Sequence, residues 1–226
     1  MQRLKEHGIE LGLNKCEFSK DSVQFLGFRV TGEVLKPAPE MVKSLMEAKV
    51  PINLTQLRSF LGAYSFYRRF IPNFATIVSD LVALTEGYSA KVKGVNVPVN
   101  CDEKCLQAFQ KLKEIMSKEI VLQYPDFSKP FHLYTDASDN SIGAWVGQEE
   151  NGDVRPIVFL SRSLSKAERN FPVIEKENLS IIWALRSCRP FLLGARIQIK
   201  TDARSLIYLF KYAHPSSRHY RWMLTI

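Results

Sequence analysis

The sequence has few features of a secreted or membrane-bound protein. None of its 226 positions belongs to an apolar run of about 18 residues, the length that a transmembrane helix needs. Residues 1–12 carry charges where a secretory signal peptide needs an apolar core. Four cysteines are too few for a disulfide framework, so we expect reduced thiols. These absences predict a cytoplasmic or nuclear protein without a membrane partner.

Acidic residues are scarce near the C-terminus. The whole chain has 31 Lys and Arg against 23 Asp and Glu, a net charge of +8. From Asn178 onward the only acidic residue is Asp202. The basic residues of that stretch are Arg186, Arg189, Arg196, Lys200, Arg204, Lys211, Arg218 and Arg221. Such a charge balance suits a phosphate backbone, although an ordinary basic surface would have the same composition.

The composition, with 46% hydrophobic and 24% charged residues, is that of a folded protein. In the first half, aromatic and β-branched residues over 23–35 predict a β-hairpin or two short strands around Thr31-Gly32. Apolar spacing and prolines predict helices at about 40–50, 54–66, 76–84 and 103–118. Asn53 followed by Gln56 has the spacing of a capping box at the start of the second helix.

One glycine stands out within these helices. Gly62 lies inside the helix expected over 54–66, where it costs about 1 kcal/mol relative to alanine. A glycine there indicates close approach of another group to the backbone. Arg58, Gly62 and Phe66 are spaced i, i+4 and i+8 and so share one helix face. Taken without the family, Arg58 fits a solvated charge and Phe66 fits core packing better than either fits a contact to a ligand.

The second half has a different pattern. Strands are expected at 131–134, 142–146, 155–160 and 196–200, with a hairpin turn at Asn151-Gly152. A helix is expected over 174–188, and two more over 205–210 and 218–224. Three strands, a helix and a further strand predict an α/β domain built on one sheet.

Acidic residues follow two of these strands. Asp136 and Asp202 each come after a threonine at a strand end, and Glu175 and Glu177 open the intervening helix. Carboxylates that meet at one end of a sheet form a site for Mg²⁺, which prefers oxygen ligands. Two such ions can hydrolyse a phosphodiester. The alternative is that both aspartates are ordinary turn residues at strand ends.

Two weaker patterns leave alternatives open. Cys101 and Cys105, together with His214 and His219, have a loose spacing that a zinc site could use. Ser138, two residues after Asp136, fits either a contact to an RNA 2′-hydroxyl or a simple turn role. The three tryptophans fit core positions better than base-stacking platforms.

Longer stretches resemble a known family. They are LGLNKCEFSKDSVQFLGFRVTGEVLKP, LRSFLGAYSFYRRFIPNFA, AFQKLKEIM, LQYPDFSKPFHLYTDASDNSIGAWVGQ, RPIVFLSRSLSKAERNFPVIEKENLSIIWALRSCRPFLLG and IKTDARSL. In this order they resemble the Pol polyprotein of Ty3/gypsy-type LTR retrotransposons, from the end of the reverse transcriptase into its ribonuclease H domain. The resemblance covers nearly the whole chain except about residues 87–101.

The resemblance implies roles for individual residues. Asp136, Glu177 and Asp202 match metal-binding catalytic carboxylates of the ribonuclease H site, with Mg²⁺ as cofactor in a two-metal arrangement and Mn²⁺ as a substitute. The remaining residues would contact nucleic acid: Phe25, Leu26 and Gly27 in a primer-grip hairpin, Arg58, Gly62 and Phe66 on a thumb helix, Ser138 beside the site, and Arg68, Arg69 and Arg204 on phosphates.

Some parts of the family pattern are missing from this sequence. It contains no Tyr-x-Asp-Asp motif, which holds the metal-binding aspartates of the polymerase. It also lacks a later helix with the fourth carboxylate of ribonuclease H, and alanine replaces the usual histidine at Ala203. We therefore expect a C-terminally incomplete ribonuclease H domain with weak or absent activity in isolation.

These observations predict three parts. Residues 1–36 are a palm remnant with the hairpin, 37–122 a helical thumb and tether, and 123–226 an α/β, ribonuclease-H-like mixed sheet with flanking helices. The function expected is binding of an RNA–DNA hybrid or duplex with Mg²⁺-dependent hydrolysis of the RNA strand, alongside the rest of the Pol polyprotein. The alternatives are a non-catalytic nucleic-acid-binding module and a degenerate or purely structural product.

Overall fold

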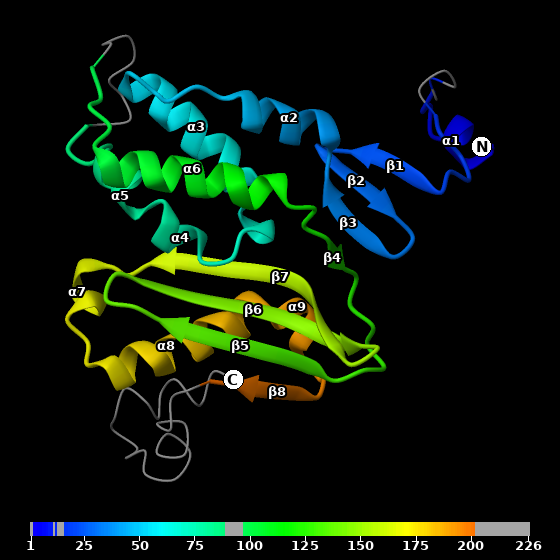
Figure 1. The fold of residues 1–226 in the computed structure, drawn as a ribbon. Coiled ribbons are helices and arrows are strands. Elements are labelled where there is room, and N and C mark those ends of the chain that lie inside the picture. The colour runs from blue at the N-terminus through cyan, green and yellow to red at the C-terminus, as the bar shows by residue number, and fades with distance from the viewer. Residues whose placement is uncertain (1, 11, 13–15, 89–96, 202–226) are drawn as a thin grey trace.

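The computed structural model describes residues 2–10, 12, 16–88 and 97–201. They form two bodies stacked one on the other (Figure 1). The upper body in that view holds a small sheet and the helices between residues 39 and 117. The lower body holds a larger sheet with helices on its rear face.

The small sheet is antiparallel and joins distant parts of the chain. Its strands pair in the order β1 (Ser22–Phe25), β2 (Phe28–Thr31), β3 (Val34–Pro37) and β4 (Leu122–Gln123). The expected hairpin around Thr31-Gly32 is confirmed as the β2–β3 turn. A short helix, α1 (Gln2–Glu6), precedes the sheet. β3 and β4 pair although the whole helical segment lies between them in the sequence, so this pairing brings the two ends of that segment together.

Five helices build the first hydrophobic core. They are α2 (Pro39–Glu47), α3 (Leu54–Phe66), α4 (Phe74–Ile77), α5 (Ser79–Ala83) and α6 (Glu103–Ser117), with a 3₁₀ turn over Arg68–Phe70. Tyr64, Phe70 and Leu112 are fully buried at its centre. The single helix expected over 76–84 is wrong, because the chain divides at Val78. There α4 packs on the larger sheet while α5 packs on α6, so tertiary contacts override the helical pattern.

Side-chain caps set the starts of the two long helices. The Asn53 carboxamide accepts a hydrogen bond from the Gln56 amide at 2.9 Å, as the sequence predicts. The Gln56 side chain accepts in return from the amide of Ile52, one residue before the position in a standard capping box. Asp102 caps α6 by accepting from the Cys105 amide at 2.9 Å.

The larger sheet is mixed. Its strands are β5 (Phe131–Ala137), β6 (Ser141–Glu150), β7 (Asp153–Ser163) and β8 (Ile197–Lys200), in the spatial order β7-β6-β5-β8. β8 runs parallel to β5, and the other neighbours are antiparallel. Asn151 and Gly152 both have positive φ, at 54° and 89°, as a two-residue hairpin turn requires.

Three helices follow β7. They are α7 (Lys166–Arg169), α8 (Val173–Ser187) and α9 (Arg189–Leu192). Ile181 and Leu185 of α8 pack on Leu133 and Val146 of the sheet in a second core. The predicted fold class, an α/β mixed sheet with flanking helices, is confirmed. The helices expected over 205–210 and 218–224 lie outside the described residues.

The two bodies meet where α4 and the preceding 3₁₀ turn lie on the larger sheet. The Ala75 amide donates to the Ser161 hydroxyl at 3.0 Å, and the hydroxyls of Thr76 and Ser141 are 2.7 Å apart. The Arg68 guanidinium donates to the Ser161 carbonyl. These bonds hold α4 on the face of the sheet opposite α8. In the part of the chain that the structure describes, no helix combines the length and apolarity needed to cross a membrane.

Candidate functional site

Asp136 lies one residue before the end of β5 and is exposed. Its partner across the sheet is Gly143 of β6. Side chains alternate along a strand, and Ala137 packs in a cluster with Leu179 of α8. Asp136 therefore projects from the opposite face of the sheet, which it shares with Tyr134.

Glu177 lies in the second turn of α8 and is 8% exposed. It precedes Ile181 and Leu185 by one and two turns, so it belongs to the helix stripe that faces the sheet. Glu175, the other acid of this segment, lies in the first turn and is half-buried. The more buried glutamate is thus the one to which the family resemblance assigns a catalytic role.

Lys176 ties α8 to the turn that follows Asp136. Its side chain is buried, and its ammonium donates to the Asp139 carbonyl and to the Asp139 carboxylate, both at 3.3 Å. Figure 1 shows that α8 begins at the end of the sheet toward which β5 and β8 both point. Asp136 and Glu177 therefore lie at the same end of the sheet. Sequence reasoning missed Lys176, because an ammonium between two glutamates has the pattern of a solvated surface charge.

The two carboxylates approach the end of β5 from its two faces. Hard cations prefer such oxygen donors, so the donor chemistry fits Mg²⁺. The third predicted ligand, Asp202, lies outside the described residues, as does Arg204. Among the residues described, no three His, Cys, Asp or Glu side chains are grouped as a metal site would require. That finding covers Cys101 and Cys105, whereas His214 and His219 lie outside the described part.

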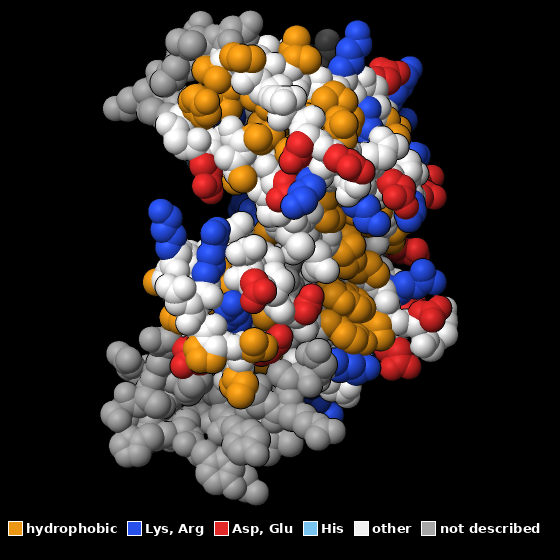
Figure 2. Space-filling view, turned by 60° about the vertical axis from the view of Figure 1, so that its left-hand side comes forward, with side chains coloured by type: hydrophobic (Ala, Val, Ile, Leu, Met, Phe, Trp, Pro, Cys, Tyr) orange, Lys and Arg blue, Asp and Glu red, His pale blue; other side chains and the backbone are white. Residues whose placement is uncertain are grey.

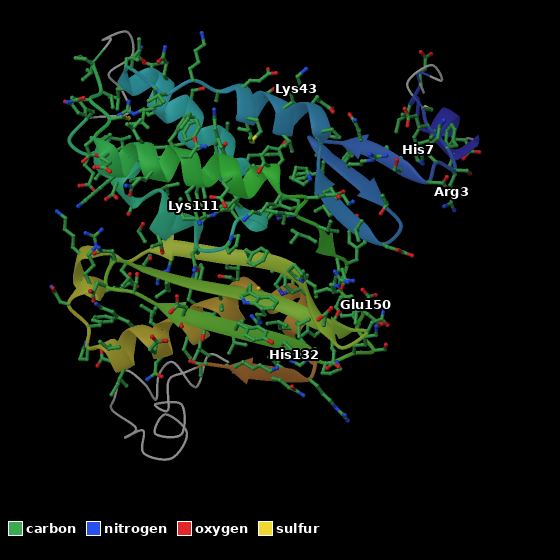
Figure 3. All side chains as sticks on the ribbon, in the orientation of Figure 1. Arg3, His7, Lys43, Lys111, His132 and Glu150 are labelled. Carbon is green, nitrogen blue, oxygen red and sulfur yellow. The ribbon has the colours of Figure 1, made fainter. Side chains whose placement is uncertain are left out.

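Histidine is not part of this end of the sheet within the described residues. His132 lies near the start of β5, at the opposite end of that strand from Asp136 (Figure 3). His7 follows α1 beside the small sheet (Figure 3).

Ser138 is engaged in the turn between β5 and β6. Its hydroxyl donates to the Ser141 carbonyl at 3.0 Å and accepts from the Ser141 amide at 3.1 Å. The hydroxyl of Ser141 lies 2.9 Å from it. These bonds close the turn and fit the turn role that the sequence left open.

The predicted primer-grip hairpin has an exposed tip. Phe25 is 62% and Leu26 is 72% exposed. Leu26 and Gly27 both have positive φ, at 48° and 81°, which closes a two-residue turn between β1 and β2. The Tyr67 hydroxyl donates to the Gly27 carbonyl at 2.9 Å, so the helical body positions the tip.

Arg58, Gly62 and Phe66 differ in their surroundings on α3. Gly62 is exposed and has open space where a side chain would project. Phe66 is 51% exposed and stacks on Phe28 of the hairpin, with ring centres 5.0 Å apart. Arg58 donates to the Tyr88 carbonyl at 2.7 Å. The exposed α3 face is thus continuous with the hairpin.

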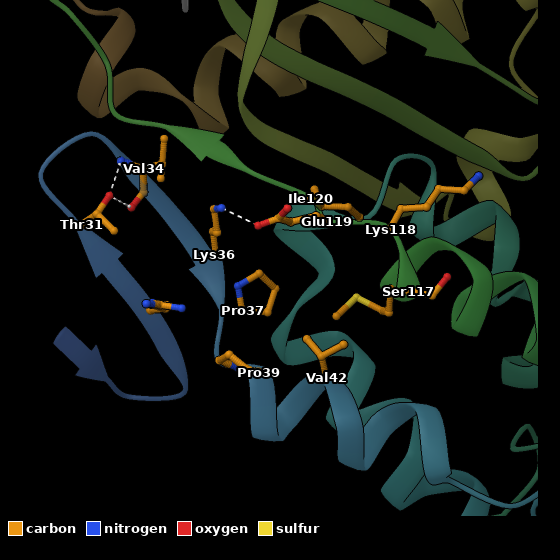
Figure 4. Close-up of a pocket in the computed structure, with 12 residues that line it drawn as sticks. Thr31, Val34, Lys36, Pro37, Pro39, Val42, Ser117, Lys118, Glu119 and Ile120 are labelled. Carbon is orange, nitrogen blue, oxygen red and sulfur yellow. Dashed lines mark hydrogen bonds and ion pairs between the residues drawn. The ribbon is translucent and has the colours of Figure 1, made fainter. Parts of the chain in front are cut away.

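Two cavities flank this region. A groove of about 590 Å³ lies between the hairpin tip at Gly27, α2 at Leu45 and α3 at Phe60. A second pocket, of about 500 Å³, lies between β2–β3 and the end of α6 (Figure 4). Lys36 and Glu119 form an ion pair at 2.5 Å across its rim. None of the predicted site residues lines that second pocket.

The two neighbouring arginines play different structural roles. Arg68 donates to the Ser161 carbonyl and lies 5.9 Å from the Phe74 ring centre, between the two bodies. Arg69 is exposed. Only Arg69 has its guanidinium open to a phosphate without disturbing the contact between the bodies.

An aromatic row covers part of the sheet face that carries Asp136. Tyr134 and Trp145 stack with ring centres 4.1 Å apart, and Phe159 continues the row at 6.1 Å. All three are half-buried, and Figure 2 shows hydrophobic side chains exposed on this face below the helical body. Trp183 lies on the other face, under the Arg162 guanidinium.

Comparison with known sequences identifies the class. Residues 126–226 match the family described as the RNase H-like domain found in reverse transcriptase. Over 99% of its length, the chain is 39% identical to the Retrovirus-related Pol polyprotein from transposon opus of Drosophila melanogaster. It is 38% identical over 97% of its length to the corresponding polyprotein from transposon gypsy of the same organism, and 31% identical over 99% to a Tf2-3 polyprotein of Schizosaccharomyces pombe. It spans 23%, 21% and 17% of these relatives, about a fifth of their length.

Solved structures share the fold. The foamy viral protease-reverse transcriptase in complex with double-stranded DNA superposes with a TM-score of 0.77 at 23% identity, over 99% of this chain and 38% of that one. The same viral protein with an RNA/DNA hybrid gives 0.73 at 23% identity, over 94% and 28%.

The fold and the matches define a reverse transcriptase segment with an RNase H-like domain. More specifically, the chain corresponds to a segment of a gypsy-type retrotransposon Pol polyprotein, which confirms the resemblance seen in the sequence.

Proposed function

We propose that this chain binds an RNA–DNA hybrid or duplex and hydrolyses the RNA strand at the end of the larger sheet, using Mg²⁺. The observation that carries the proposal is the bond from Lys176 to Asp139, at 3.3 Å. It fixes the start of α8, and with it Glu177, beside the turn after Asp136. Two carboxylates from separate elements thereby share one end of the sheet.

The three acidic residues would bind the metal from different elements of the domain. Asp136 would contribute an exposed carboxylate from one face of β5, and Glu177 a buried carboxylate from the other. Asp202 would supply the third, as the family resemblance implies. When bound by such residues, Mg²⁺ lowers the pKa of water and stabilises negative charge on a phosphate. Mn²⁺ takes the same oxygen ligands.

The upper body would hold the duplex. The exposed tip at Phe25 and Leu26 and the α3 face at Gly62 form one surface, joined through Phe66 and Phe28. A glycine with open space above it admits a sugar–phosphate backbone that a side chain would exclude. Arg69 offers an exposed cation for a phosphate. The neighbours solved with double-stranded DNA and with an RNA/DNA hybrid support this assignment.

A cleavage assay on the purified chain tests the proposal. The substrate is a hybrid with a labelled RNA strand, in Mg²⁺ and in EDTA. Asp136→Asn and Glu177→Gln should each reduce cleavage at least a hundredfold, because both remove a charged metal ligand. Glu175→Gln is the matched control, two residues from Glu177, and should retain activity. Cleavage that survives Asp136→Asn would contradict the proposal.

A second function is favoured by one observation. Asp136 and Glu177 lie on opposite faces of β5, which is compatible with a module that binds nucleic acid without cutting it. Hybrid binding that weakens with added salt, with no cleavage in Mg²⁺ or in Mn²⁺, would establish that function. We expect weak or absent turnover from the isolated chain, and robust turnover would show that expectation wrong.

A further inference from the structure

Asn73 lies over the strand next to Asp136. A Cβ atom added to Gly143 would be 2.6 Å from the Asn73 Oδ1 atom, closer than Cβ atoms come to their neighbours in proteins. Gly143 is the partner of Asp136 across the sheet. Directly opposite residues in antiparallel strands have Cα atoms about 4.5–5.5 Å apart. A side chain from the helical body therefore reaches the face of the larger sheet beside the candidate catalytic carboxylate.

The Asn73 side chain is available to a ligand. The residue is exposed and has a left-handed backbone, with φ 50° and ψ 34°. Its carboxamide does not cap α4, and no group among the described residues hydrogen-bonds it. Asparagine tolerates this backbone better than most residues, but a glycine would tolerate it too. Backbone geometry alone does not account for an amide at this position.

The segment around Asn73 is held firmly. The Ala75 amide bonds to Ser161 at 3.0 Å, and Thr76 bonds to Ser141 at 2.7 Å. Ser161 lies opposite Gly143 on the strand beyond it. The backbone that carries the amide is thus fixed relative to the sheet, which limits where the amide can reach.

We propose that the Asn73 amide contacts the RNA strand of a bound hybrid, at a ribose 2′-hydroxyl beside Asp136. This inference rests on the proposed function. A 2′-hydroxyl both donates and accepts hydrogen bonds, and a carboxamide offers both partners on one planar group. A phosphate would be served better by a cation, and the nearby Arg68 is already bonded to the Ser161 carbonyl. The absence of a side chain at Gly143 makes room for the amide.

Three variants separate this role from a structural one. Asn73→Gly removes the amide and keeps the backbone conformation. Gly143→Ala leaves Asn73 in the chain but pushes its amide away, and the displaced atom is the end of a flexible side chain. The double variant has no amide to displace. Binding is measured by fluorescence anisotropy of the full chain in Ca²⁺ against an RNA–DNA hybrid and a DNA duplex of the same sequence, with folding checked by thermal unfolding.

The inference predicts that each single variant weakens hybrid binding about three- to tenfold, the effect of one lost hydrogen bond, and leaves duplex DNA binding within twofold. The double variant should be no weaker than Asn73→Gly, because the two changes remove the same contact. Unchanged hybrid binding, or equal losses on hybrid and DNA, would overturn the inference while leaving the proposed function standing. If the unsubstituted chain bound neither nucleic acid, both would fail.

Discussion

Arg162 and Glu168 form a two-pronged ion pair, with nitrogen–oxygen distances of 2.8 and 2.9 Å. Arg162 belongs to β7, and Glu168 belongs to the short helix that leads into α8. The Arg162 guanidinium also lies 5.6 Å from the ring centre of Trp183 on α8. This pair therefore helps fix the helix that carries Glu177 against the sheet that carries Asp136.

The ion pair predicts an acid-sensitive contribution to stability. Hydrogen bonding to Arg162 lowers the pKa of Glu168 to about 2. A carboxyl with a depressed folded-state pKa contributes stability that is present above about pH 4.5 and is lost as the pH falls through about 2. Glu168→Gln should cost on the order of 2 kcal/mol at pH 7 and much less at pH 2. Urea unfolding at the two pH values measures this, with the exposed Glu86→Gln as control. Equal losses at both pH values would contradict it.

Removing one hydroxyl should loosen the hairpin tip. Tyr67→Phe deletes the bond to the Gly27 carbonyl, but that carbonyl still accepts from the Ala38 amide at 3.0 Å. The expected cost is therefore about 1 kcal/mol or less, because no buried acceptor is left unpaired. Burial, with a smaller effect of Glu40, raises the pKa of Tyr67, so the hydroxyl stays protonated as a donor. Thermal unfolding checks the cost, and the more exposed Tyr124→Phe should have none.

A methyl group at the hairpin turn should be poorly tolerated. The backbone of Gly27 has φ 81°, and an added Cβ would be 2.9 Å from the Tyr67 hydroxyl and 3.3 Å from Phe66. Gly27→Ala should cost roughly 2 kcal/mol from backbone strain and crowding. Gly32→Ala in the next turn has open space and should cost far less. Similar unfolding free energies for the two variants would show that the turn at Gly27 is not packed against Tyr67 and Phe66.

The two arginines of the 3₁₀ turn should respond to different measurements. Arg68→Met removes a bond between the bodies and should lower stability by about 1–2 kcal/mol. Arg69→Met should leave stability unchanged, weaken nucleic-acid binding and reduce the slope of log affinity against log salt by about 1. Unfolding and binding in a salt series are measured on both variants. A salt slope unaffected by Arg69→Met would argue against a phosphate contact there.

Much of the fold follows from local sequence signals. The cap at Asn53, the turn at Asn151-Gly152 and the apolar stripe of α8 each depend on neighbours within a few residues, which a sequence displays directly. β4 has only two residues and no periodicity, and it pairs with β3 across the whole helical body. The division at Val78 arises because α4 and α5 pack on different partners. Strand pairing and helix packing between distant segments cannot be predicted from the pattern of neighbouring residues.

The candidate site divides in the same way. Residue types and order predict Asp136 and either Glu175 or Glu177 at one end of a sheet, and the family resemblance selects Glu177. In the structure Asp136 and the start of α8 lie at the same end, joined through Lys176 and Asp139. The faces from which they approach depend on strand register, which the sequence alone did not supply. Lys176 and Asn73 were missed because their partners, Asp139 and Gly143, come from other elements. Asp202 lies outside the described residues and stays a prediction from its place after an expected strand and from the resemblance.

The most direct test of a shared metal site is Mn²⁺ binding by the full chain in the presence of an RNA–DNA hybrid, followed by electron paramagnetic resonance. We expect tight Mn²⁺ binding that weakens at least tenfold in both Asp136→Asn and Glu177→Gln and is unchanged in Glu175→Gln. Mn²⁺ binding that is the same in all four proteins would contradict it, because it would show that these two carboxylates hold no ion together.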